Sequence, residues 1–195
     1  MKKLIILSAS LFLITIAKSQ DPHFGVKAGL NAASLNNAGN RGQTKIGFNA
    51  GVFAHIHTSL HWTIQPEIMF STEGNREPLI GGNLVGTHAL NYINFPVLLQ
   101  YMFNNGLRLE GGAQFGVLVS AKDKVANNSS DVKDMYQSTA VSIPLGVSYL
   151  TKKGYGIDAR YVFGLSNIYK DDSQTIQSNV FQLDIFYQFS DRWKK

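Results

Sequence analysis

Five histidines are the residues of this chain best suited to metal or acid–base chemistry: His23, His55, His57, His61 and His88. His55, His57 and His61 flank a short polar segment that reads as a tight turn, and we expect only His55 to face inward. Metal ligands must converge and be oriented by a supporting shell, whereas successive strand residues point to opposite faces. We therefore expect solvated turn residues here and no metal site.

A second candidate chemistry is hydrolysis by a serine, a histidine and an acid. Ser71, Glu73 and His88 lie near predicted outer strand ends, but no sequence motif joins them, and such a triad is defined by its geometry. The glycine pairs at 81–82 and 111–112 precede no helix and so do not form phosphate loops. The absence of cysteine excludes disulfide scaffolds and thiol catalysis. We expect no catalytic residue, no metal and no cofactor.

Seven charged residues share the polar face of alternating segments, and they are the most informative polar set. Three cations and four anions can neutralise one another in a narrow interior, which an eight-stranded barrel fills with side chains. We expect an electrostatic plug rather than a pore or a catalyst. This lumen charge network comprises Lys27, Glu67, Arg108, Glu110, Asp158, Arg160 and Asp184.

The elements that must position these charges are strands, because hydrophobicity alternates with a period of two along most of the chain. The expected strands cover residues 24–33, 44–56, 62–72, 89–102, 107–119, 139–150, 155–166 and 179–189. Short connections follow the second, fourth and sixth strands, and long polar loops follow the first, third, fifth and seventh. All turns then lie at one end, which predicts an all-β, eight-stranded antiparallel up-and-down barrel.

The direction of the apolar face decides whether this barrel is soluble or spans a membrane. Six strands place an aromatic residue on the apolar face near the short-turn end, as an interfacial girdle requires. The girdle comprises Phe24, Trp62, Tyr101, Tyr149, Tyr155 and Tyr187. The apolar faces of the eight segments carry no charge, and ten residues tilted by ~45° rise about 23 Å, close to an outer-membrane band. We favour the membrane orientation. A soluble, periplasmic ligand-binding barrel with its apolar face inside is the alternative.

Composition and charge support export rather than nucleic-acid binding. Of the 18 basic residues, three lie in the first nineteen positions, which contain no acid, so the remainder carries 15 basic and 13 acidic residues. Residues 1–19 combine a basic start, an apolar run too short to span a bilayer and small residues before the cleavage point, which predicts a signal peptide cut after Ser19. Residues 20–195 would form the outer-membrane barrel domain.

Three prolines conflict with this scheme. Pro66, Pro96 and Pro144 fall inside expected strands, where a closed barrel has no edge for a missing N–H group. Each lies four or five residues from the girdle aromatic of its strand, so we expect bulges at a common height.

Five motifs follow one another along the chain: residues 24–31, 65–74 and 92–101, Ile143-Pro144-Leu145-Gly146 and residues 160–168. In these motifs the chain resembles the PorT-like outer-membrane β-barrel family of bacteria. The resemblance implies an eight-stranded barrel in the outer membrane of a Gram-negative cell. Its partners would be membrane lipids, the barrel-assembly machinery and secretion or envelope proteins. We expect a non-enzymatic scaffold or loop-mediated binding role, with a pore as an alternative.

Overall fold

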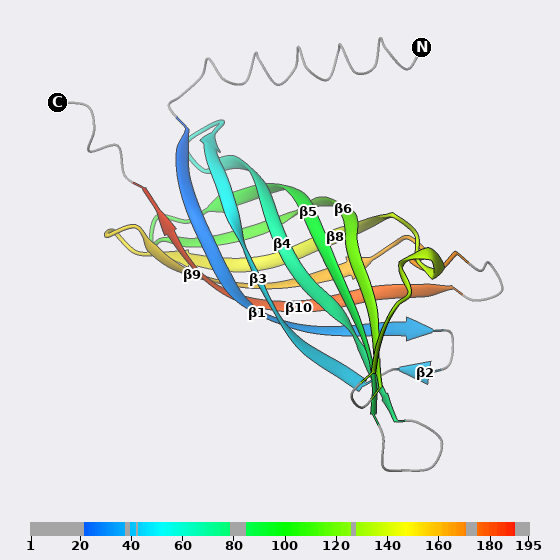
Figure 1. Cartoon of the computed structure of the whole chain (residues 1–195). Coiled ribbons are helices and arrows are strands. Elements are labelled where there is room, and N and C mark those ends of the chain that lie inside the picture. The colour runs from blue at the N-terminus through cyan, green and yellow to red at the C-terminus, as the bar shows by residue number, and fades with distance from the viewer. Residues whose placement is uncertain are drawn as a thin grey trace, which may run out of the picture.

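The computed structural model describes residues 22–37, 40–41, 43–78, 85–125, 128–170 and 175–189. Eight long strands form its body: β1 (His23–Asn37), β3 (Gln43–His57), β4 (Trp62–Pro78), β5 (Val85–Met102), β6 (Leu107–Val125), β8 (Thr139–Leu150), β9 (Tyr155–Gly164) and β10 (Ile176–Gln188). Each long strand pairs antiparallel with the next one along the chain, and β10 pairs back onto β1. The sheet is therefore a closed eight-stranded barrel (Figure 1).

Side-chain alternation explains why these segments are strands with two distinct faces. Along β9, Gly156, Asp158, Arg160 and Val162 are buried, whereas Tyr155, Ile157, Tyr161 and Phe163 are exposed. The other strands repeat this pattern, with large apolar side chains outside and most of the buried polar and charged side chains inside. A soluble barrel would have the opposite orientation.

Tight turns close one end of the barrel. In two of them a glycine takes a positive φ, Gly106 at 91° and Gly154 at 89°. Their N–H groups donate to the carbonyls of Phe103 and Thr151, at 3.1 and 3.0 Å. A side chain at either position would be strained, since residues other than glycine rarely adopt this backbone conformation.

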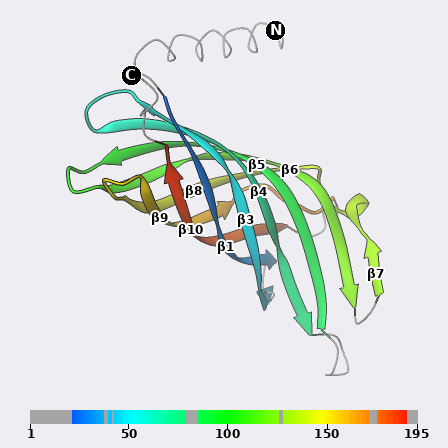
Figure 2. The same cartoon turned by 60° about the vertical axis from the view of Figure 1, so that its left-hand side comes forward.

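The strands run further than expected at the opposite end. β4 continues to Pro78, β5 begins at Val85 and β6 ends at Val125. Two short strands, β2 (Asn40–Arg41) and β7 (Asn128–Asp131), and the 3-10 helix η1 (Lys133–Met135) lie in segments expected to be loops. Figure 2 shows β7 beside the end of β6, beyond the body of the barrel.

The expectation that the three prolines mark bulges is wrong. The β3–β4 pairing keeps one register from Phe53↔Glu67 to Ile56↔Ile64 and lacks paired residues only around Pro66. Pro96 and Pro144 likewise interrupt the pairing with one neighbour, β4 and β6 respectively, without shifting it. The register shifts lie elsewhere, at Thr44/Asn49 and Asn91/Tyr92. Each proline therefore removes a local hydrogen bond without adding a residue.

No helix within the described ranges is long and apolar enough to cross a membrane.

Candidate functional site

A layer of ionised side chains crosses the lumen. Its members come from every second strand around the barrel: Lys27 on β1, Glu67 on β4, Glu110 on β6, and Asp158 and Arg160 on β9. Alternate strands fill one layer because tilt and stagger bring their inward positions to the same height. All five residues are at most 6% exposed, so neighbouring charges must compensate one another.

Arg160 is the centre of this layer. Its Nη1 and Nη2 donate to the two carboxylate oxygens of Glu67, each at 3.1 Å. Its Nε donates to Glu110 Oε1 at 2.8 Å, and Nη2 also reaches Asp158 Oδ2 at 2.9 Å. The planar guanidinium supplies five fixed donors, a geometry that suits several carboxylates at once.

Lys27 is the second cation of the layer. Its Nζ lies 2.6 Å from Asp158 Oδ2 and 3.1 Å from Glu67 Oε1. The rings of Phe53 and Phe186 lie beside it, with centroids 6.0 and 5.8 Å from Nζ, and pack against each other edge to face. Two cations and three carboxylates therefore share one buried site beside these rings.

The other two predicted charges lie outside this direct contact. Arg108 Nη2 donates to the side-chain oxygen of Gln188 at 3.2 Å. Asp184 Oδ1 accepts from Asn49 Nδ2 at 2.8 Å. Both residues are buried. The structure thus joins five of the seven predicted residues by ion pairs and holds the remaining two through amides.

Amide side chains complete the polar lumen, and they are not among the site residues predicted from the sequence. Gln65 Nε2 donates to Glu67 at 2.8 Å, and Gln100 Nε2 donates to Glu110 at 2.7 Å. Asn31 and Asn49 bond each other at 2.7 Å. Their positions on the inward, polar face of the strands are the sequence signal that identifies them.

Above the charge layer, toward the long-loop end, the lumen contains a further buried acid, Glu73. Its carboxylate accepts hydrogen bonds from Ser71, Asn94 and Ser178 at 3.0, 3.3 and 2.8 Å. A cavity of about 20 Å³ remains beside it, which is enough for roughly one water molecule. Glu73 was expected to begin a loop, but β4 continues because Ser71, Glu73 and Asn75 preserve the inward alternation.

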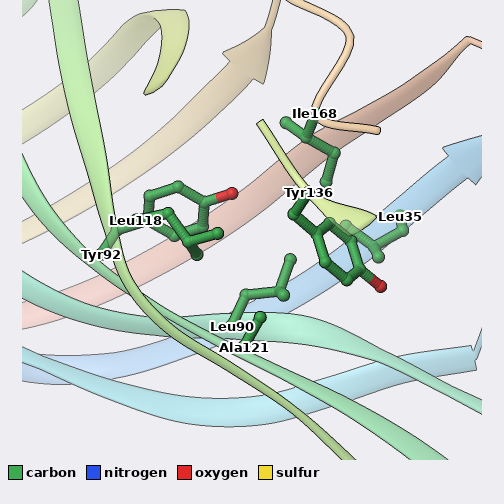
Figure 3. Close-up of a cluster of buried hydrophobic side chains, with 7 residues drawn as sticks. All are labelled: Leu35, Leu90, Tyr92, Leu118, Ala121, Tyr136 and Ile168. Carbon is green, nitrogen blue, oxygen red and sulfur yellow. The ribbon is translucent and has the colours of Figure 1, made fainter. Parts of the chain in front are cut away.

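An apolar cluster caps the lumen at the long-loop end (Figure 3). It contains Leu35, Leu90, Tyr92, Leu118, Ala121, Tyr136 and Ile168, all buried. Tyr136 and Ile168 belong to different connections, which are tied together by the Tyr136↔Tyr169 bridge and by the Gln137 N–H donating to the Ile168 carbonyl at 2.8 Å. The charge layer and the apolar cap therefore occupy the lumen at two different heights along the barrel.

The residues considered for catalysis do not assemble. Ser71 lies in the lumen against Asn31 and Glu73, whereas His88 pairs with Asp123 on the outer extension. His55 faces the lumen as expected and contacts Gln65 at 3.1 Å, while His61 stacks on Tyr101. No group of three metal-binding side chains capable of holding an ion occurs in the described part of the chain.

Comparison with known proteins identifies the family of this barrel. Residues 18–170 match the family described as "Outer membrane protein beta-barrel domain". The chain belongs to this family. It is an outer-membrane β-barrel, and its family membership agrees with the apolar outer face described above.

Solved structures show the same fold. The barrel resembles Neisserial surface protein A with a TM-score of 0.62 and 14% identity, over 87% of this chain and 100% of that one. The attachment invasion locus protein Ail of Yersinia pestis gives a TM-score of 0.54 and 18% identity over the same shares of the two chains. A second structure of Ail contains the heparin analogue sucrose octasulfate. No curated protein matches the chain in sequence.

The predicted aromatic girdle lies on the outer wall of this outer-membrane barrel, at its short-turn end. Trp62 packs against Tyr101 with ring centroids 5.1 Å apart, and Tyr155 packs against Tyr187 at 4.9 Å. Phe24 and Tyr149 are exposed on neighbouring parts of the same wall. That these six rings meet lipid headgroups, as amphipathic side chains at an interface do, stays a prediction. The expected signal peptide, residues 1–19, lies outside the described residues.

Proposed function

We propose that this protein is a non-conducting membrane anchor that presents a binding surface outside the outer membrane. The filled lumen carries this proposal. Arg160 and Glu67 close the interior at the charge layer, and the Tyr136 and Ile168 cap closes it again toward the loops. The cavity beside Glu73, between these two levels, has a volume of about 20 Å³, which leaves little room for a solute in this part of the described barrel and argues against a pore.

The binding surface is the extension of β4, β5 and β6 together with β7. These strands continue beyond the apolar band, and the four residues of β7 are all exposed. Strands that project from a rigid barrel hold loop residues in place, which lowers the entropy lost when a partner binds. We propose a macromolecular partner because the described extension offers a broad sheet rather than a deep pocket.

Conductance measurements test the anchor role. The full protein, reconstituted in a planar bilayer beside a porin as positive control, should show no discrete current steps. Regular steps of fixed size would favour the small-solute pore instead.

Site-specific photo-crosslinking in intact cells tests the binding role. A crosslinker at Ser129 on β7 should give a discrete adduct, whereas the matched position Ser59 in a tight turn at the opposite end should not. An equal adduct at both positions, or none at Ser129, would contradict an outward binding surface.

We further propose that the protein belongs to the PorT-like branch and assists protein secretion or envelope assembly. The motifs around residues 24–31, 65–74 and 160–168 support this relation. Outer-membrane lipids would surround the barrel, and the barrel-assembly machinery would insert it after export. Deletion of the gene should reduce one or more exported proteins, and restoring the full-length gene should return them. An unchanged set of exported proteins would contradict the secretion role.

A further inference from the structure

A group of cations lies on the outer wall just above the apolar band of β6. Val119 is an exposed apolar residue of this strand, three positions before Lys122, and Lys133 of η1 donates from its Nζ to the Val119 carbonyl at 3.1 Å. This hydrogen bond fixes an ammonium group at the upper limit of the apolar surface. The side chain of Lys133 is nevertheless exposed, so its other donors can reach a ligand.

Lys122 and Lys124 lie on the same wall. Ala121 is fully buried and Asp123 pairs inward with His88, so the alternation of the strand turns Lys122 and Lys124 outward. Both are exposed.

Arg76 extends this group across the sheet. Register places Arg76 opposite Thr87, and Thr87 opposite Lys124, in one row across β4, β5 and β6. Strands lie about 4.8 Å apart, so Arg76 and Lys124 are separated by roughly 10 Å.

The rim segments of β4, β6 and η1 bring four cations together on this side of the barrel. The acids of these segments are Glu77, Asp123, which pairs with His88, Asp131, opposite Lys122, and Asp134. Outward rim positions on the far wall, such as Ser34 on β1 and Asn179 on β10, carry no charge. Directly beneath the cations, Phe115, Val117 and Val119 form an exposed apolar surface.

We propose that this basic rim, defined as Arg76, Lys122, Lys124 and Lys133, binds the phosphorylated headgroup of an outer-leaflet lipid. Cations above an apolar wall match an amphipathic ligand, because phosphate meets the ammonium groups while an acyl chain follows the side chains below. The site lies on the outward face of the β4 and β6 extension, which is part of the binding surface proposed above, and it rests on that proposal. It makes one sector of the wall a specific lipid site.

Lipid retention by the full protein, measured by native mass spectrometry in detergent, tests the proposal. The probe is bisphosphorylated lipid A, compared with its dephosphorylated form, with phosphatidylcholine and with inorganic phosphate. Each lysine near a lipid headgroup contributes about fivefold in affinity. The variant K122Q/K133Q should therefore bind bisphosphorylated lipid A roughly 25-fold more weakly.

The control variant K152Q/K153Q removes the same charge from an exposed turn at the other end of the barrel and should bind like the wild type. K122R/K133R should retain binding, which separates loss of charge from loss of fold. Equal weakening in K122Q/K133Q and K152Q/K153Q would overturn the proposal, as would no weakening in either. Equal binding of dephosphorylated lipid A would show a tail site only, and displacement by dilute inorganic phosphate would show a free-anion site; either would also overturn it.

Discussion

Arg160 and Glu67 bond each other across the full width of the barrel. Their strands, β9 and β4, are four positions apart in either direction around the closed sheet, and both guanidinium Nη atoms reach the carboxylate. This bidentate pair holds opposite walls together and carries the centre of the charge layer.

Removal of this guanidinium should strongly destabilise the fold. Arg160→Ala leaves Glu67, Glu110 and Asp158 together in a buried site with only Lys27 beside them. Breaking a buried ion pair costs about 3–5 kcal/mol. The heat-modified gel shift from folded to unfolded form should therefore move to a clearly lower temperature. Lys152→Ala, on an exposed turn, should leave the transition in place, and an unchanged Arg160→Ala transition would argue against the charge layer as a stabilising element.

A cation introduced at mid-wall should reveal the direction of the apolar face. Leu183 is 54% exposed at the centre of the outward side of β10. Leu183→Arg should lower the free energy of unfolding in a bilayer by about 2–4 kcal/mol. Leu165→Arg, at the outer rim, should cost no more than about 1 kcal/mol. Equal effects in urea titrations of the two variants would contradict a lipid-facing wall.

The girdle predicts a shallow position for Trp62. With Trp193 replaced by Phe, Trp62 is the only tryptophan of the chain. Its fluorescence should be quenched more strongly by lipids brominated near the headgroup than by lipids brominated near the tail end. The control L183W in a W62F/W193F background should show the reverse order. The same order in both proteins would place Trp62 away from the interface.

Gly25 and Gly156 leave space for the rings of Phe53 and Phe186 beside Lys27. A Cβ on Gly156 would lie 2.1 Å from Phe186 Cζ, so Gly156→Ala must displace that ring, at about 1–3 kcal/mol of stability. Adding the same change to Phe186→Leu should cost less, because the shorter side chain leaves space. A double-mutant cycle on the unfolding midpoint measures this coupling, and strict additivity would show that the ring is not the obstacle.

Export should remove residues 1–19. Intact mass and N-terminal sequencing of the protein purified from membranes should give a chain that begins at Gln20, because small residues precede that position. A variant with Ala17→Arg and Ser19→Arg should accumulate in uncleaved form. Recovery of wild-type protein with Met1 still attached would contradict the signal peptide.

The strands were predictable because nearly every one alternates strictly between lipid-like and polar side chains. Asp158 and Arg160 show this directly, since both are buried while the apolar residues Ile157 and Tyr161 beside them are exposed. Their partners were not predictable. Which inward charges meet depends on the height of each residue along the barrel. Strand tilt and stagger around the closed sheet set this height, and no local pattern in the sequence encodes it.

The outer part of the molecule was harder to predict for a different reason. Toward the long-loop end the inward residues of β5 and β6 become apolar, as at Leu90 and Leu118, so the two-face pattern disappears. The cap also depends on Tyr136 and Ile168, which reach the lumen from separate connections. Their contact is a long-range consequence of the fold and leaves no periodic signal.

The supply of the central ions by β1, β4, β6 and β9 has a consequence for biogenesis. An incomplete sheet in the bilayer would hold Lys27 without Asp158 and Glu67 without Arg160, leaving each ion to face hydrocarbon or a water defect. Pairing of β10 with β1 therefore completes the hydrogen bonds of the closed sheet and brings the buried charges together with their partners in the same event. This favours all-or-none insertion over a series of stable, partly assembled intermediates.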